Sequence, residues 1–174
     1  MGAPQHTVRS VETVSMLTRD GVRLDADIYR PQENRPDETF PVLLMRQPYG
    51  RRIASTVVFA HPTWFAAHGY IVVIQDIRGR GTSDGTYALF ANDAEDGADA
   101  VRWAATLPGA NGRVGMYGFS YQGVSQLLAA SALLSETGSA RPLHAMAPAM
   151  IGYGIHDDWV YEGGAFYLAP NIGW

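Results

Sequence analysis

The chain has 174 residues, of which 47% are hydrophobic and 17% charged, and a formal net charge of −4. This size and composition are typical of one globular domain. The sequence contains no cysteine and no lysine. These absences exclude a thiol nucleophile, a cysteine metal site, a phosphate-loop lysine and a Schiff-base lysine.

The charge and the first residues limit the partners that we expect. An acidic balance lacks the clustered positive charge that nucleic-acid binding needs. No apolar run reaches membrane-spanning length, and Met1–Ser10 lacks the apolar core of a signal peptide. We therefore expect a cytoplasmic protein with no nucleic-acid or membrane partner, and with no metal or other cofactor.

Two strands are predicted near the amino terminus, over Thr13–Leu17 and Val22–Tyr29. Asp20-Gly21 lies between them and favours the positive backbone angles of a tight hairpin. Apolar and polar residues alternate along the second strand, which predicts one buried face and one face exposed to water.

The pattern then changes to short, nearly continuous apolar runs, which are typical of strands buried on both faces of a parallel sheet. A helix is predicted from Asn92, with Asn92 as its N-cap, to Pro108-Gly109. A second helical run follows from Val124 to Leu134, and the sequence thus predicts an α/β sheet with an added antiparallel hairpin. The four predicted buried strands are Phe40–Met45, Tyr70–Ile74, Val114–Tyr117 and Leu143–Ala147.

The last stretch, Pro148–Trp174, is rich in aromatic residues and glycine. Two interpretations of it remain open: a core segment with its aromatic side chains packed inside, or a lid that lines an apolar pocket. The aromatic residues concerned are Tyr153, Trp159, Tyr161, Phe166, Tyr167 and Trp174.

Ser120 follows an apolar run and precedes a helical run, in the sequence Gly118-Phe-Ser-Tyr-Gln-Gly123. A nucleophile elbow needs this order of strand, sharp turn and helix, because the turn exposes the serine hydroxyl at the helix N-terminus. The usual pattern is G-x-S-x-G, whereas here Gln122 fills the last place and glycine comes one residue later. The alternative is that Ser120 only caps a helix.

Two further signals follow predicted strands. The run from Asp76 to Gly85 is rich in glycine, but Asp84 stands where the third glycine of a dinucleotide loop belongs, so we expect an Asp76–Arg78 pair that ties loops together. In Arg46-Gln-Pro-Tyr-Gly50, Pro48 places Tyr49 at the carboxyl edge of the sheet, where its phenol could point at Ser120. A surface turn is the other interpretation of Tyr49.

Taken in order, these motifs resemble cocaine-esterase-like hydrolases, relatives of X-prolyl dipeptidyl peptidases and α-amino-acid ester hydrolases. In that family the glycine one place late is normal. The resemblance implies an α/β-hydrolase fold with a mostly parallel sheet and helices on both faces, with residues 1–147 in the catalytic domain and 148–174 starting a helical cap. It also implies that Ser120 is the nucleophile and that the backbone N–H of Tyr121 and the hydroxyl of Tyr49 form the oxyanion hole. The motifs are Arg-x-Pro-Tyr, Asp-x-Arg-Gly-x-Gly-x-Ser-x-Gly, Gly-x-Ser-Tyr-x-Gly and Gly-Gly-Ala-Phe.

A serine hydrolase of this fold needs an acid and then a histidine after the serine. Glu136 precedes His144 and His156, but it lies just past the helix that follows the elbow and not at a later strand end. By the resemblance, the triad acid and base lie beyond the cap, in sequence that this chain does not contain. Three interpretations stay open: a fragment of a longer hydrolase, half of a split enzyme, or a remnant without catalysis.

We expect a serine hydrolase that cleaves a small ester or amide, or a short peptide, through an acyl-enzyme on Ser120. The chain alone is expected to be inactive, and its missing carboxyl-terminal part is its expected partner. The alternative is a non-catalytic interaction module that binds a partner through its aromatic tail.

Overall fold

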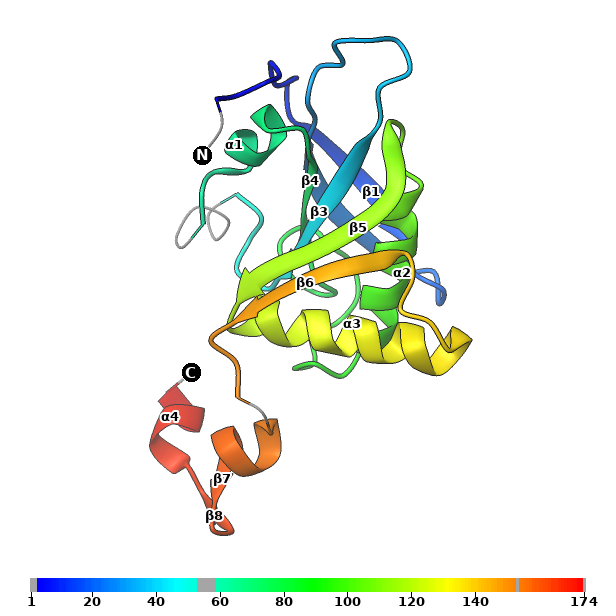
Figure 1. Ribbon diagram of the computed structural model, residues 1–174. Helices are drawn as coiled ribbons and strands as arrows, with labels where there is room; N and C mark the ends of the chain where they lie inside the picture. Colours follow the sequence, from blue (N-terminus) through cyan, green and yellow to red (C-terminus); the bar gives the residue numbers. More distant parts are fainter. Residues whose placement is uncertain (1–2, 53–58, 153, 174) are drawn as a thin grey trace.

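The computed structural model describes residues 3–52, 59–152 and 154–173. Its main feature is a six-stranded sheet with the strand order β1-β2-β4-β3-β5-β6 (Figure 1). The β1–β2 and β2–β4 pairs are antiparallel, and the other three pairs are parallel. The predicted sheet with an amino-terminal hairpin is thus confirmed. The strands are β1 (Glu12–Leu17), β2 (Arg23–Tyr29), β3 (Phe40–Gln47), β4 (Ile71–Asp76), β5 (Ala110–Phe119) and β6 (Leu143–Ala149).

Helices cover both faces of this sheet: α2 (Asp93–Ala105) and α3 (Tyr121–Thr137) lie on one face, and α1 (Pro62–Ala67) lies on the other (Figure 1). Alternate residues of β4 enter two separate cores. Ile71 and Val73 pack with residues of α2 and α3, whereas Val72 and Ile74 pack on the side of α1. A strand that is buried on both faces has no polar positions in its middle, which is why its sequence is a continuous apolar run. The same prediction is wrong for β6, where Leu143 alone is buried because β6 is the last strand of the described sheet.

The predicted wet face of β2 is wrong. Asp25 and Asp27 lie on that face, and each is only 5% exposed. Arg51 donates to Asp27 through Nε over 2.8 Å, the Thr82 hydroxyl donates to Asp25, and the backbone N–H of Asp25 donates to Ser83 Oγ. Segments that follow β3 and β4 therefore cover the polar face, and the alternation in β2 separates an apolar core from a buried polar network.

The helix α2 begins where the sequence predicts, with Asn92 at the N-cap position, but the Asn92 side chain makes no capping hydrogen bond. Two acidic residues in the first turn of α2 form ion pairs. Asp93 and Asp96 are buried and pair with Arg46 and Arg78. The first turn of α2 is thus fixed to the sheet and to the loop after β4 by buried ion pairs, in addition to the favourable helix dipole.

The segment after β6 comprises η2 (Ile155–Val160), the short strands β7 (Tyr161–Glu162) and β8 (Ala165–Phe166), and α4 (Leu168–Gly173). It lies beyond the carboxyl end of β6, apart from the helices that cover the sheet (Figure 1). Phe166 and Tyr167 are 45% and 36% exposed, so these two aromatic side chains are not packed in a core as one interpretation required. Tyr153 and Trp174 lie outside the described residues. No helix within the described ranges is long and apolar enough to cross a membrane.

Candidate active site

Ser120 occupies a strained turn between β5 and α3. Its backbone angles are φ 57° and ψ −124°. Residues other than glycine adopt this backbone conformation only at a cost of about 1–3 kcal/mol. The backbone N–H of Ser120 donates to the carbonyl of Ala149, at the end of β6, over 2.9 Å. The side chain makes no capping hydrogen bond to α3, so the alternative of a capping serine does not hold.

Close packing around the turn explains its pattern of glycines. A Cβ atom at Gly118 would lie 2.3 Å from Cβ of Gln122, and one at Gly123 would lie 2.5 Å from Cγ2 of Ile151. Real Cβ atoms do not approach other atoms so closely, and both positions therefore require glycine. The second glycine comes one residue late because the chain after β6 approaches α3 at residue 123.

Gln122, which fills the usual glycine position, joins the elbow to the end of β3. Its Nε2 donates to Oε1 of Gln47 over 2.7 Å, and its Oε1 accepts from the backbone N–H of Phe119 over 3.1 Å. Gln47 in turn donates to the carbonyl of Gly50 over 3.1 Å. Neither glutamine was expected in the site, although the departure from the usual motif at position 122 was the available signal.

Tyr49 lies beside Ser120, as the resemblance implied. Burial raises the pKa of the Tyr49 phenol, and hydrogen bonds with the side chain of Ser120 and with the backbone of Tyr121 offset part of this rise. The side chain is 43% exposed, so one side of the phenol remains open. The structure therefore brings together Ser120, Tyr49 and the backbone of Tyr121, and Tyr49 is not merely part of a surface turn.

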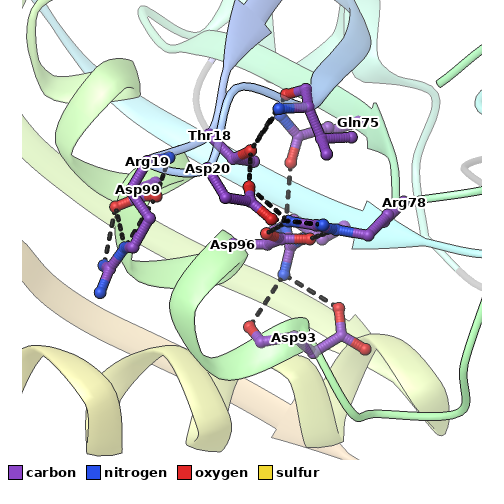
Figure 2. A network of polar contacts seen from close by, with 10 residues as sticks. Thr18, Arg19, Asp20, Gln75, Arg78, Asp93, Asp96 and Asp99 are labelled. Atoms are coloured by element: carbon purple, nitrogen blue, oxygen red, sulfur yellow. Dashed lines mark hydrogen bonds and ion pairs between the residues drawn. The ribbon is translucent and has the colours of Figure 1, made fainter. Parts of the chain in front are cut away.

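Arg51 anchors the other end of the turn that carries Tyr49. Its backbone N–H donates to Oδ1 of Asp76 over 2.8 Å, and its guanidinium binds both Asp76 and Asp27. The predicted Asp76–Arg78 pair is therefore wrong. Arg78 instead pairs with Asp20 over 2.7 Å and with Asp96 over 2.6 Å. Figure 2 shows it between these two carboxylates. Arg78 follows Asp76 by two residues, but the chain turns between them and carries Arg78 toward α2.

The side chain of Tyr121 fixes the residue after the serine. Its hydroxyl donates to Asp93, and its ring stacks on Phe90 with 4.4 Å between the centroids. Burial raises the pKa of this hydroxyl, and the charge of Asp93 raises it further. Arg46, which is completely buried, donates to Oδ1 of Asp93 over 3.1 Å. Asp93 is labelled in Figure 2 beside this polar network.

Two cavities lie beside these groups. One has a volume of about 370 Å³ and is lined by Ser120, Met150, Ile151, Gly152 and Trp159. The other has a volume of about 410 Å³ and is lined by Pro48, Tyr49, Arg80, Tyr87, Leu89 and Asn171. Both volumes are within the range of small-molecule sites. Ser120 opens to one cavity and Tyr49 to the other, so the contact between them lies where a bound carbonyl could meet both.

The histidine side chains have hydrogen-bond partners away from Ser120. After the elbow, His144 contacts the carbonyl of Pro142 over 2.6 Å at the start of β6, and His156 contacts Asp157 over 2.6 Å. Glu136 binds Arg19 and Arg102 near the far end of α3. Among the described residues, no group of three or more histidine, aspartate and glutamate side chains is arranged to hold a metal ion.

Removing the Gln122 side-chain hydrogen bonds tests whether they position Tyr49. We expect Gln122→Leu to lower kcat about tenfold in the full-length protein, because the resemblance implies that the Tyr49 hydroxyl is an oxyanion donor, and small displacements of such a group are costly. The variant also leaves Gln47 without its buried partner, which costs about 1–3 kcal/mol of stability. Steady-state hydrolysis and thermal unfolding measure the two effects, with the exposed Gln5→Leu as the control.

A double variant separates positioning from stability. In Gln47→Leu/Gln122→Leu neither side chain leaves the other unpaired, so we expect part of the lost stability to return, although Phe119 N–H and the Gly50 carbonyl still lose their side-chain partners. We expect kcat to stay low, because the Gln47–Gln122 hydrogen bond no longer helps to fix the Tyr49 turn against the elbow. A kcat that recovers together with stability would show that the two glutamines serve only folding.

The strained serine between strand and helix, on a sheet of this strand order, defines an α/β-hydrolase fold. Solved structures agree. An α-amino acid ester hydrolase aligns with 95% of this chain and 29% of its own, at a TM-score of 0.68 and 27% identity. An aminopeptidase from a marine-sediment Thaumarchaeota archaeon aligns with 90% of this chain and 28% of its own, at a TM-score of 0.66 and 26% identity.

The family model described as X-Pro dipeptidyl-peptidase (S15 family) matches residues 20–174, and the chain belongs to this family. Among curated proteins, it is similar to the cocaine esterase of Rhodococcus sp. (strain MB1 Bresler), with 38% identity over 164 residues. That alignment covers 92% of this chain and 27% of the esterase. The chain thus spans less than a third of the length of this relative.

Proposed function

We propose that the protein carrying this chain is a serine hydrolase that cleaves an ester or amide through an acyl-enzyme on Ser120. The observation that carries the proposal is the contact of Tyr49 with Ser120 and with the backbone of Tyr121, at a strained turn that opens to a cavity. Membership of a family with esterase and peptidase relatives supports it. The substrate is a small ester or amide, or a short peptide.

In this mechanism the hydroxyl oxygen of Ser120 attacks the carbonyl carbon, and a base takes its proton. The carbonyl oxygen becomes an oxyanion, which accepts hydrogen bonds from the backbone N–H of Tyr121 and from the hydroxyl of Tyr49. The tetrahedral intermediate then expels the alcohol or amine, which takes up a proton, and leaves an acyl group on Ser120. Water attacks this ester in the same way and releases the acid.

We also propose that the triad acid and base come from sequence beyond this chain, so that the chain alone is inactive. The histidines here have other partners, and Glu136 is held by two arginines. The relatives named above are more than three times longer than the part aligned with this chain. In this organisation residues 1–147 belong to the catalytic domain and 148–174 begin a cap.

The test is covalent labelling of the full-length protein with a fluorophosphonate, which reacts with activated serines. We expect wild type to be labelled and Ser120→Ala not to be labelled, because the probe forms its bond with the Ser120 oxygen. Ser131→Ala is the matched control, since Ser131 is an exposed serine on α3, the helix that follows Ser120. Equal labelling of wild type and Ser120→Ala would remove the assignment. No labelling of either would favour a non-catalytic interaction module.

A further inference from the structure

Arg80 lies in the wall of the cavity that Tyr49 lines, and it has no carboxylate partner within the part of the chain that the structure describes. The ion pairs of the described residues engage most arginines of the chain, and Arg80 is not among them. Its neighbour Arg78 is held by two carboxylates, those of Asp20 and Asp96. The loop after β4 therefore carries one arginine that is neutralised within the fold and one whose charge remains available to a ligand.

The loop after β4 restricts the backbone on both sides of Arg80. The glycines on either side of it pack so tightly that a Cβ at Gly79 would lie 2.2 Å from the backbone nitrogen of Tyr87, and one at Gly81 would lie 2.0 Å from Oδ2 of Asp76. The guanidinium of Arg80 lies over the ring of Tyr87, with 3.8 Å from its central carbon to the ring centroid. This stacking holds the cation in place but leaves its N–H groups free to donate.

Tyr87 connects Arg80 with the proposed oxyanion hole. It lines the same cavity as Tyr49, and the two phenols are close enough for the charge of one to raise the pKa of the other. Tyr49 in turn contacts Ser120. A ligand in this cavity would thus have a hydroxyl donor next to the nucleophile at one side and a guanidinium at the other.

We propose that Arg80 determines specificity by binding a carboxylate on the part of the substrate that lies in the Tyr49 cavity. A guanidinium matches the two oxygens of a carboxylate and keeps its charge at any physiological pH. The cavity, at about 410 Å³, has room for a short acyl or leaving group that ends in such an anion. The inference rests on the proposed function and adds a substrate class to it: esters or amides that carry a carboxylate.

The kinetic test uses the full-length protein and two matched pairs of esters. One pair places the carboxylate on the acyl side, with the para-nitrophenyl monoester of glutarate against para-nitrophenyl pentanoate. The other places it on the leaving group, with the acetyl ester of para-hydroxybenzoate against that of para-hydroxybenzamide. We expect Arg80→Gln to lower kcat/KM for one anionic ester by about 10- to 100-fold, as for a lost hydrogen bond to a charged group. The kcat/KM for the matched neutral ester should change less than about twofold.

Two variants serve as references. Arg80→Lys keeps the charge but not the fork, so we expect it to retain part of the preference for the anionic ester. Arg113→Gln removes another exposed arginine, on β5 before the elbow, and should leave all four rates unchanged. Equal losses for anionic and neutral esters in Arg80→Gln, or no loss for either anion, would overturn the inference.

A binding measurement separates this inference from the proposed function. Calorimetry measures binding of the glutarate monoester and of the para-hydroxybenzoate ester to Ser120→Ala and to Ser120→Ala/Arg80→Gln. We expect at least one of them to bind at least tenfold more weakly when Arg80 is replaced, whether or not wild type turns it over. Weaker binding without turnover in wild type would sustain the carboxylate site and count against the hydrolase. Equal binding of both by the two variants would overturn the site alone.

Discussion

Ser120→Ala is expected to lower kcat of the full-length protein by about 10⁴- to 10⁶-fold, with KM little changed. Without the oxygen no acyl-enzyme forms, and only the oxyanion donors and the bound geometry still favour attack by water. The cavity that Ser120 lines is otherwise kept, since alanine differs by one oxygen atom. Steady-state hydrolysis of a neutral para-nitrophenyl ester measures the effect. Turnover within tenfold of wild type would mean that the nucleophile is another residue.

Ser120→Gly is the companion variant because it separates chemistry from strain. Alanine keeps a side chain at φ 57°, whereas glycine adopts this angle without a steric cost. Both variants lose the nucleophile and should be equally inactive. We expect the free energy of unfolding of Ser120→Gly to exceed that of Ser120→Ala by about 1 kcal/mol, so Ser120→Gly should unfold at a higher temperature. Equal unfolding temperatures would show that the turn is not strained at this position.

The architecture could be predicted from the sequence because strands, turns and helices follow from the order of apolar, polar and glycine residues within short segments. The apolar run at residues 71–74 has no alternation, and the structure buries it between two cores. The glycines of the elbow and the helical run after it likewise predicted a strand, a turn and a helix around Ser120. These features depend on neighbouring residues alone.

The wrong predictions concern partners that are distant in sequence. Alternation in β2 predicted water beside Asp27, because nothing near Asp27 shows that Arg51, 24 residues later, covers it. The same arginine takes the place beside Asp76 that Arg78 was expected to fill. A charged residue that is buried needs a partner, but only the folded chain decides which one is near enough.

The sequence pointed to the positions of Ser120 and Tyr49, but it did not reveal the residues that support them. Ser120 and Tyr49 belong to recognisable motifs, and they lie in contact. Asp93 lies in the first turn of α2, where an acid suits the helix dipole, yet it also accepts from the Tyr121 hydroxyl and from the buried Arg46. Gln122 was treated as a departure from a pattern, yet it links the elbow to the Tyr49 turn. Supports of this kind join separate segments, so no single motif contains them.

Tyr49→Phe is expected to lower kcat by about 10²- to 10³-fold, because it removes one of two proposed donors to the oxyanion. KM should change little, since the ring remains and the hydroxyl acts mainly on charge that develops in the transition state. Tyr70→Phe is the control: it removes a phenol hydroxyl from the residue just before β4, at the end of that strand opposite to Asp76. An unchanged kcat in Tyr49→Phe would mean that the second donor lies elsewhere.

The pH dependence gives an independent check on the same hydroxyl. Burial raises the pKa of Tyr49 above its ordinary value of 10.0, which favours the protonated form. Only this form donates a hydrogen bond, so the donor is fully present at neutral pH and is lost as pH rises through the raised pKa. We therefore expect kcat of wild type to show no loss from Tyr49 until pH exceeds 10.0. In Tyr49→Phe this alkaline loss should be absent, and a fall in wild type that the variant shares must come from another group.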